Sequence, residues 1–567
     1  MQHSLKRLAL ALPACVLAFW GCVEQWQLQP GASCAVWMLI CAAAVLAASL
    51  LKTARRVSIV SAALGLLLAA FMVVGSEIHT FETIERLLDL REMPKAVMRL
   101  LGLAILAASL LRLISHGLMY TKPSNVTPPF WLLWLIIFSC WLPYFVVYYP
   151  GCVSNDSFNE IRTILGQLPL NNHHPLVHQW TIAPFVLLGQ AVGSLELGIG
   201  LYSLFQMALM SAIFAYAVWE LGRRGTSLWL RVALLAWYAL HTVNAFYSIS
   251  MWKDVLFGGI ALLLVMQLLR LCDRSKEEKM PLRSWLMLGG TMFLFCLYRN
   301  NGYYAFLFGI PFFILFNRRL WKPLLATGLA VFIAINAYQS LIFDVLGAEK
   351  SKSGESLSVP LQQIARTVRY HHRSVTDEET AILEEIFPSV EEVRWAYIPH
   401  ISDPVKDLFQ ADVFNADPLR YAKVWLQLGL RHPLVYLDAF LYQGHGYWYP
   451  DTPYWTVYVG IYENEFGLTT PATHAAQALH SHHDRLEWNR VTGWLYRPGS
   501  YVWLTLIACG LLLCKKRAKL LTPVLFLLGV WLTTLLSPVY AEYRYVYSII
   551  VAAPFLLGMA QAIPPKT

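Results

Sequence analysis

Residues 149–180 decide how the chain is organised, and they read YPGCVSNDSFNEIRTILGQLPLNNHHPLVHQW. This stretch is a polar, turn-rich interruption between long apolar segments. It contains Asp156, Glu160 and three histidines, His173, His174 and His178. A loop that opens with Tyr-Pro-Gly, offers a carboxylate and returns through His-His-Pro is more typical of a functional site than of a simple connection.

The composition around this loop is that of a membrane protein. Of the 567 residues 57% are hydrophobic and 14% charged, against roughly 25% charged in soluble domains, and the mean hydropathy is +0.49. The net charge of +9 does not indicate a nucleic-acid partner, because the basic residues form short clusters between apolar runs, as the positive-inside rule produces. The ten cysteines show neither a disulfide framework nor a zinc-site spacing.

The apolar runs predict an all-α polytopic membrane protein with about fourteen transmembrane helices. We expect the first run to be a membrane helix rather than a cleaved signal peptide, because no small-x-small site followed by a soluble domain comes after it. The predicted spans are 8–23, 35–51, 57–75, 97–114, 131–148, 196–219, 228–248, 255–271, 284–298, 303–316, 323–343, 501–514, 520–536 and 545–562.

The side on which each loop lies depends on residues 175–192. If they crossed the membrane, Arg223 and Arg224 would face outward, against the positive-inside rule. Pro175, His178 and Pro184 interrupt this apolar run, so we predict a short helix at the outer surface. Both termini and the basic clusters then lie in the cytoplasm, and the loop 149–195 faces outward.

Four units follow from this topology. They are an N-terminal four-helix membrane extension (1–125), a membrane core with the loop 149–195 (126–343), a mainly helical outer domain (344–500) and C-terminal membrane helices (501–567). Within the outer domain, Thr376 and Glu379 have capping-box spacing, and Asp417-Pro418 has the pattern of a helix start. Three short loops share the outer side with 149–195, and they read MWKD (251–254), YRNNGY (298–303) and SPVYAEYRY (537–545).

Asp156 is the candidate general base. Ser157 and Glu160 have the S-x-x-E spacing of a capping box, so a helix starting at Ser157 would engage Glu160 and leave Asp156 free just before it. A free carboxylate can accept a proton from a hydroxyl group. The alternative is a carboxylate that is merely solvated.

The histidines could bind a metal, since His174 and His178 share a helix face, but no supporting ligand lies at a suitable spacing. We therefore assign His173, His174, His178 and Glu160 to substrate or loop hydrogen bonding, expect no resident cofactor, and leave a divalent metal as the lesser possibility.

Cations at the outer side predict a phosphate site. Lys253, Arg299 and Arg544 each lie in one of the three short outer loops, where positive charge is costly unless it is paired or used. The alternative for any one of them is an interfacial anchor. Four weaker candidates for substrate binding are Asn300 and Asn301 beside Arg299, Arg366 in the outer domain, and Arg497 before the next span. No Walker loop, GxSxG or HExxH motif is present in the sequence.

The motifs NDS (155–157), NHHP (172–175), WKD (252–254), RNNG (299–302) and YRY (543–545) resemble an uncharacterised bacterial family of the GT-C glycosyltransferase type. The chain is similar to this superfamily, which includes protein mannosyltransferases and lipid A aminoarabinose transferases, over about residues 131–563. The similar features are a helix ending outside, a long first outer loop with an early acid, a surface helix opening with His-Pro-Leu, and a span closing on Arg-Arg.

This resemblance implies an inverting glycosyltransferase of the bacterial inner membrane, with its active site facing outward. It would move a sugar from a polyprenyl-phosphate donor to an extracytoplasmic acceptor of the cell envelope, with Asp156 as base and with Lys253, Arg299 and Arg544 at the donor phosphate. Two features depart from the pattern. Residues 1–125 add four helices before the usual first one, and the loop has one acid where many relatives have two adjacent acids, which disfavours a metal. The alternatives are a transporter or flippase for a lipid-linked saccharide, and an O-antigen ligase or polymerase.

Overall fold

The computed structural model describes residues 2–124, 126–172, 174–273, 280–349, 353–452, 454 and 456–562. The prediction of an all-α polytopic membrane protein is confirmed, because nine helices in this part of the chain are long and apolar enough to cross a membrane. Four further apolar helices of 10–17 residues accompany them, namely Leu228–Leu240, Leu282–Tyr298, Asn300–Phe316 and Pro498–Cys514. Every one of the fourteen predicted spans falls largely within helix; their number as spans stays a prediction.

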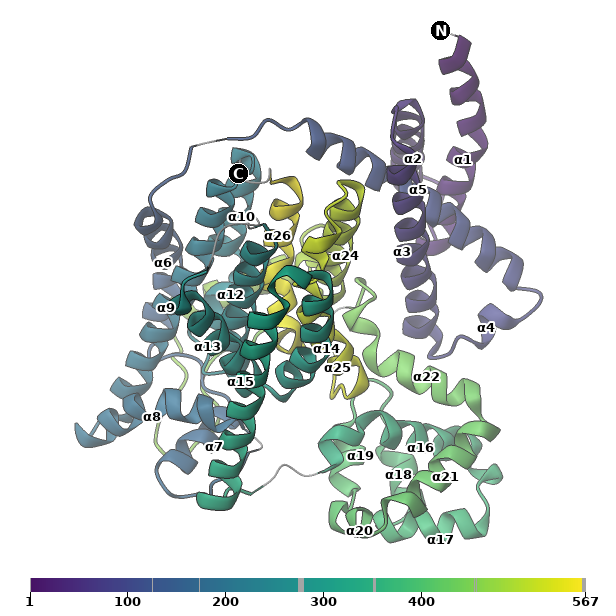
Figure 1. The fold of residues 1–567 in the computed structure, drawn as a ribbon. Helices are drawn as coiled ribbons and strands as arrows, with labels where there is room; N and C mark the ends of the chain where they lie inside the picture. Colours follow the sequence, from purple (N-terminus) through teal and green to yellow (C-terminus); the bar gives the residue numbers. More distant parts are fainter. Residues whose placement is uncertain are drawn as a thin grey trace.

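The N-terminal extension forms a separate helical unit at one side of the molecule (Figure 1). Small residues bring its helices close together, since a Cβ added at Gly65 would lie 2.8 Å from the Ala104 carbonyl oxygen. The helices of this unit are α1 (Gln2–Trp26), α2 (Ala32–Leu50), α3 (Arg55–Phe81), α4 (Glu85–Leu88) and α5 (Met93–Tyr120).

The central membrane bundle is built from two stretches of the chain that lie side by side in Figure 1. The C-terminal stretch contributes α24 (Pro498–Cys514), α25 (Val524–Leu536) and α26 (Tyr547–Gln561). The first stretch contributes α6 (Phe130–Val147), α7 (Asn155–Ile164), α8 (Leu176–Ala191), α9 (Leu195–Arg223), α10 (Leu228–Leu240), α11 (Thr242–Ser248), α12 (Lys253–Asp273), α13 (Leu282–Tyr298), α14 (Asn300–Phe316) and α15 (Trp321–Ser340).

Helix α12 defines the two ends of this bundle. Its 21 residues correspond to about 30 Å, which is the thickness of a bilayer core. Lys253 begins it at the end where α7 and α8 lie, which we call the domain end, and Asp273 closes it at the opposite end. Asp273 pairs there with Arg224 and lies 3.9 Å from Arg517. Two of the predicted basic clusters therefore share the opposite end.

Helix α8 does not cross the bundle. His174, two residues before α8, has its Nδ1 3.4 Å from Lys253 Nζ at the domain end, while α9, which follows α8, ends at Arg223 next to Arg224 at the opposite end. Sixteen residues of α8 also reach only about 24 Å. The position of α8 at the outer membrane surface stays a prediction.

The outer domain lies at the domain end, away from the first turn of α1 and the last turn of α26 (Figure 1). Its own hydrophobic core draws on residues between Leu357 and Tyr436. The capping box of Thr376 with Glu379 and the cap of Asp417 before Pro418 are both confirmed. The helices are α16 (Ser358–His371), α17 (Asp377–Ile386), α18 (Val390–Ala396), α19 (Asp403–Leu408), α20 (Ala411–Ala416), α21 (Pro418–Arg431) and α22 (Pro433–Gly444).

The later part of the predicted outer domain packs on the membrane bundle instead. Tyr447, Ala476 and Tyr496 belong to the large core formed by the bundle helices, and the Tyr148 hydroxyl donates to the Ala476 carbonyl oxygen at 2.6 Å. Helix α23 (His474–Glu487) lies in this part. The region 344–500 thus contains a helical domain followed by a segment that covers the domain end of the bundle.

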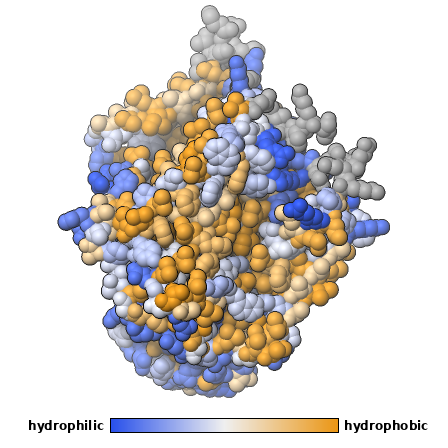
Figure 2. All heavy atoms as spheres, turned by 90° about the vertical axis from the view of Figure 1, so that its left-hand side faces the viewer, coloured by the Kyte–Doolittle hydropathy of each residue, from blue (hydrophilic) through white to orange (hydrophobic). Residues whose placement is uncertain are grey.

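The surface fits a membrane environment. Figure 2 shows broad apolar areas over the middle of the molecule and more polar atoms toward its lower end. Large apolar side chains are exposed on several bundle helices, including Val146 (65%), Leu187 (48%) and Ile333 (66%). Such side chains are expected to face lipid.

Candidate active site

The predicted outer loops meet at the domain end of the bundle. The loop after α6 pairs with the segment before α12, through a bond from the Cys152 N–H to the Ile249 carbonyl oxygen (2.9 Å) and one from the Met251 N–H to the Cys152 carbonyl oxygen (3.0 Å). Gly151 permits this approach, because its φ is +139° and a Cβ there would lie 2.7 Å from the Ile249 oxygen. The Tyr-Pro-Gly sequence therefore fixes the loop against α12.

Helix α7 begins earlier than the sequence pattern predicts. It runs from Asn155, with Ser154 as the preceding residue, so Asp156 lies in its first turn. The Ser157 hydroxyl is not a cap, because it donates to the Met251 carbonyl oxygen at 2.6 Å. The Ser154 hydroxyl accepts from the Trp252 indole N–H at 2.8 Å. Both serines thus attach α7 to the MWKD segment, and the predicted helix start at Ser157 is wrong.

Glu160 is engaged by histidine rather than by the backbone. It is buried, and its Oε2 lies 2.7 Å from His178 Nδ1, while its Oε1 lies 3.9 Å from His174 Nδ1. The predicted capping box between Ser157 and Glu160 is therefore wrong. Glu160 instead contacts His178 of α8, eighteen residues further along the chain, and not the backbone at the start of its own helix.

Both ring nitrogens of His178 lie in buried hydrogen bonds. The Gln206 amide nitrogen lies 2.7–3.2 Å from three backbone carbonyl oxygens, which orients the Gln206 oxygen to accept from the Tyr202 hydroxyl (2.9 Å). His178 Nε2 must then donate to the Tyr202 oxygen (3.1 Å). On the other side of the ring, His178 Nδ1 faces Glu160 Oε2 at 2.7 Å. This chain of bonds attaches α7 and α8 to α9.

Asp156 pairs with Arg544. The Arg544 Nη1 donates to Asp156 Oδ2 at 3.1 Å, and the Asp156 side chain remains 42% exposed. Burial would raise the pKa of Asp156, but the positive charges of Arg544, Lys253 and His174 outweigh it and lower that pKa to about 2. The carboxylate is thus ionised, accessible and held in place, rather than free of partners.

Arg544 itself is held on both sides. It lies in the short turn Tyr543–Val546 before α26 and also pairs with Glu542. Burial raises the pKa of Glu542 despite this neighbour. The guanidinium lies 5.0 Å from the ring centre of Trp252 and 5.1 Å from that of Tyr545, in cation–π range.

The other two predicted cations have different surroundings. Arg299, at the turn between α13 and α14, pairs with Asp254, whose side chain is 1% exposed. Its guanidinium lies 4.9 Å from the centre of the Tyr545 ring. The Lys253 Nζ lies 3.4 Å from His174 Nδ1. Lys253, Arg299 and Arg544 are thereby placed in one cluster with Asp156.

The weaker candidates lie outside the contacts of this cluster. Asn300 is exposed at the start of α14, and the Asn301 amide donates to Thr534 at 3.3 Å. Arg366 links the outer domain to the N-terminal extension through the Glu82 carbonyl oxygen (2.5 Å). Arg497 contacts the Glu487 carbonyl oxygen at 3.4 Å. His173 lies outside the described residues.

Two acids of the cluster had no role in the sequence prediction. Asp254 and Glu542 occupy the same short motifs as Lys253 and Arg544, and they form ion pairs with Arg299 and Arg544. The sequence did carry a signal for these two acids, because each lies next to a basic residue in a short loop of an otherwise apolar chain. The described part of the cluster thus combines Asp156, Glu160, Asp254 and Glu542 with Lys253, Arg299 and Arg544.

Potential metal ligands converge at a different place. Within the described ranges, the ligand atoms of His483, Asp484 and Glu487 on α23 lie within 4.8 Å of one another. His483 already contacts Thr242 through Nδ1 (2.7 Å) and Thr456 through Nε2 (3.2 Å). Both of its nitrogens are therefore engaged in protein hydrogen bonds.

Comparison with known sequences gives a family but no activity. Residues 166–562 match a family of unknown function, DUF6020. The chain belongs to this family. The DUF6020 match contains Lys253, Arg299 and Arg544, and it leaves out Asp156 and the N-terminal extension. No curated protein and no solved structure matches the chain.

Proposed function

We propose that this protein is an inverting glycosyltransferase that uses a polyprenyl-phosphate sugar as donor and acts at the outer face of the inner membrane. The observation that supports it most is the ionised, 42% exposed Asp156 held by Arg544 within a cluster of cations at one end of a bilayer-length bundle. A lipid phosphate lies at this depth in a membrane, next to the aqueous side from which an acceptor would approach.

The proposed reaction is a single displacement. The acceptor hydroxyl oxygen attacks the anomeric carbon, the bond from that carbon to the phosphate oxygen breaks, and Asp156 takes the hydroxyl proton. Lys253 and Arg544 stabilise the negative charge on the departing polyprenyl phosphate. Arg299, paired with Asp254, adds charge to the same site and orients the start of α12.

The low pKa of Asp156 gives this site a substrate-dependent base. The cations that bind phosphate are also those that lower the pKa of Asp156 to about 2, which makes it a weak base in the empty site. A donor phosphate would neutralise Arg544 and Lys253 and so raise the pKa of Asp156. Asp156 would become an effective base only when the donor is bound.

The positions of the charges favour an enzyme over a transporter. Transporters place substrate and ion sites near mid-membrane on interrupted helices. Here Lys253 begins α12, Arg299 lies between two helices and Arg544 precedes α26. All three lie at helix ends.

Donor binding is the first test. We expect Lys253→Ala to weaken binding of polyprenyl phosphate by about ten- to a hundredfold, because a charge-assisted contact contributes roughly 1.5–3 kcal/mol. Binding would be measured on full-length protein in nanodiscs by displacement of a labelled polyprenyl phosphate. Lys322→Ala is the matched control, since it removes an exposed cation in the first turn of α15. Equal affinity in both variants and the parent would remove Lys253 from the donor site.

The proposed orientation can be tested by cysteine labelling. In intact cells, a membrane-impermeant maleimide should label cysteines introduced at Asn155 and Arg420, and should label those at Arg223 and Lys516 only after the membrane is opened. All four positions are exposed, and the parent with its ten cysteines sets the background. The reverse pattern would place the domain end in the cytoplasm, and labelling at both 155 and 223 would show that α8 crosses.

A further inference from the structure

The N-terminal extension contains a cavity of about 770 Å³ among α1, α2, α3 and α5. This volume is within the range of small-molecule sites, roughly 300–1,000 Å³. Arg366 and Asp438 contact the chain just after α3, so α3 ends at the domain end. The cavity, which borders the start of α3, therefore lies at the opposite end and is separate from the Asp156 cluster.

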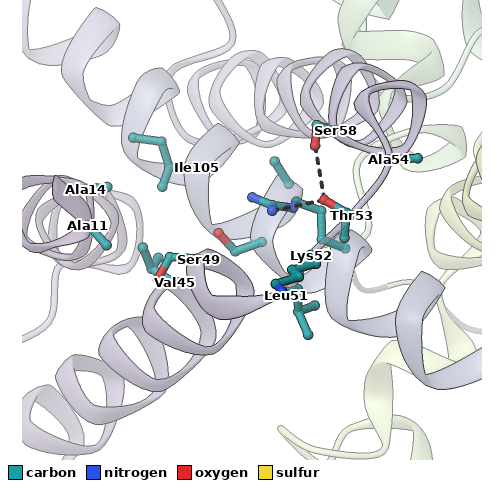
Figure 3. Close-up of a pocket in the computed structure, with 13 residues that line it drawn as sticks. Ala11, Ala14, Val45, Ser49, Leu51, Lys52, Thr53, Ala54, Ser58 and Ile105 are labelled. Atoms are coloured by element: carbon teal, nitrogen blue, oxygen red, sulfur yellow. Dashed lines mark hydrogen bonds between the residues drawn. The ribbon is translucent and has the colours of Figure 1, made fainter. Parts of the chain in front are cut away.

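One side of the cavity carries positive charge and hydroxyl groups. The Arg112 Nη2 donates to the Thr53 hydroxyl at 3.1 Å, and this hydroxyl lies 3.2 Å from that of Ser58. Lys52 precedes Thr53 in the loop between α2 and α3 and also lines the cavity. Figure 3 shows Lys52, Thr53 and Ser58 on one side of the space. Guanidinium, ammonium and hydroxyl groups together fit a phosphate.

The other side of the cavity is mainly apolar. Ala11 and Ala14 of α1 lie across the space from Thr53 in Figure 3, and Val45 and Ile105 also line it. Helix surfaces of this unit expose large apolar side chains, for example Ile59 at 57%, as expected for a lipid-facing unit. An occupant that suits both sides has an anionic head and an apolar tail.

We propose that this cavity binds the phosphate headgroup of an anionic membrane lipid from the leaflet at the opposite end of the bundle. Basic pockets between transmembrane helices are known to receive such headgroups. Lys52 and Arg112 bind the phosphate, Thr53 and Ser58 bind its oxygens or the neighbouring hydroxyls, and the alanine side holds the first part of the acyl chains. This site gives the N-terminal extension a role as a lipid-binding unit, independent of the proposed transfer reaction.

The test compares lipids on the full-length protein in detergent. Native mass spectrometry would measure how much dioleoyl phosphatidylglycerol or dioleoyl phosphatidylcholine remains bound. We expect the parent to retain phosphatidylglycerol selectively, and Lys52→Gln and Arg112→Gln each to weaken its retention about tenfold. Lys52 is exposed, so its replacement leaves the fold intact even if the Arg112 variant does not fold.

Arg55→Gln is the matched control, because Arg55 is exposed in the same loop-to-helix region but does not line the cavity. A loss in Arg55→Gln equal to that in Lys52→Gln would overturn the site in favour of general surface attraction. Displacement of the lipid by millimolar glycerol 1-phosphate would overturn the lipid assignment and identify a soluble phosphate ligand. Equal retention of the two lipids by the parent would overturn the proposal altogether.

Discussion

Asp156→Asn should lower the rate of sugar transfer by about 10²–10⁴, the usual contribution of a general base. The asparagine oxygen can still accept from Arg544, so the variant loses the proton-accepting carboxylate and little else. Because the Asp156 side chain is 42% exposed, its ion pair contributes at most about 1 kcal/mol to stability. The measurement is release of polyprenyl phosphate from a defined lipid-linked sugar in nanodiscs, with amounts of folded protein matched.

Glu196→Gln is the matched control for this experiment. Glu196 is an exposed acid in the first turn of α9, so its replacement makes the same chemical change without touching the cluster. Its transfer rate should equal that of the parent. If folded Asp156→Asn transferred sugar at the parental rate, Asp156 could not be the base.

The pH dependence of the same reaction tests the substrate-dependent base. With the pKa of Asp156 at about 2 in the free protein, kcat/KM should show no acid limb from this group above about pH 4. Bound donor neutralises Arg544 and Lys253, so the acid limb of kcat, which reports the complex, should lie at higher pH. If the acid limbs of kcat and kcat/KM lay at the same pH, the donor phosphate would not contact these cations.

The convergence of the site could be predicted because a bilayer restricts where polar segments lie. Once the basic clusters assign one side to Arg224 and Arg517, alternation of the spans assigns Asp156, Lys253 and Arg544 to the other. The structure brings those three residues into one cluster. Sequence order and hydropathy were sufficient for this, since membrane helices leave only two planes for charged loops.

Partners within the cluster could not be predicted in the same way. The Ser157 and Glu160 pattern predicts a local capping box, but Glu160 instead forms a buried hydrogen bond with His178. Arg299 pairs with Asp254, 45 residues away in the chain, a choice that depends on how α12, α13 and α14 pack. Periodicity gives the face of a helix, but not which of several nearby acids a given arginine meets.

The pairing of Arg299 with Asp254 predicts a large effect on stability. Removing one partner of a buried ion pair costs about 3–5 kcal/mol, because the other charge remains without compensation. Asp254 is 1% exposed and Arg299 11%, so both Arg299→Ala and Asp254→Ala should lower the unfolding free energy by about this amount. Unfolding would be followed by SDS titration in mixed micelles, before any activity is compared.

The double variant separates pairing from a direct role in donor binding. If the pair is mainly structural, Arg299→Ala combined with Asp254→Ala should be more stable than either single variant, since no buried charge is then left alone. Arg299→Lys should retain part of the stability, because an ammonium keeps the charge but not the planar guanidinium geometry. Additive losses in the double variant would show that the two residues act independently. Arg299 would then be available to the donor phosphate rather than committed to Asp254.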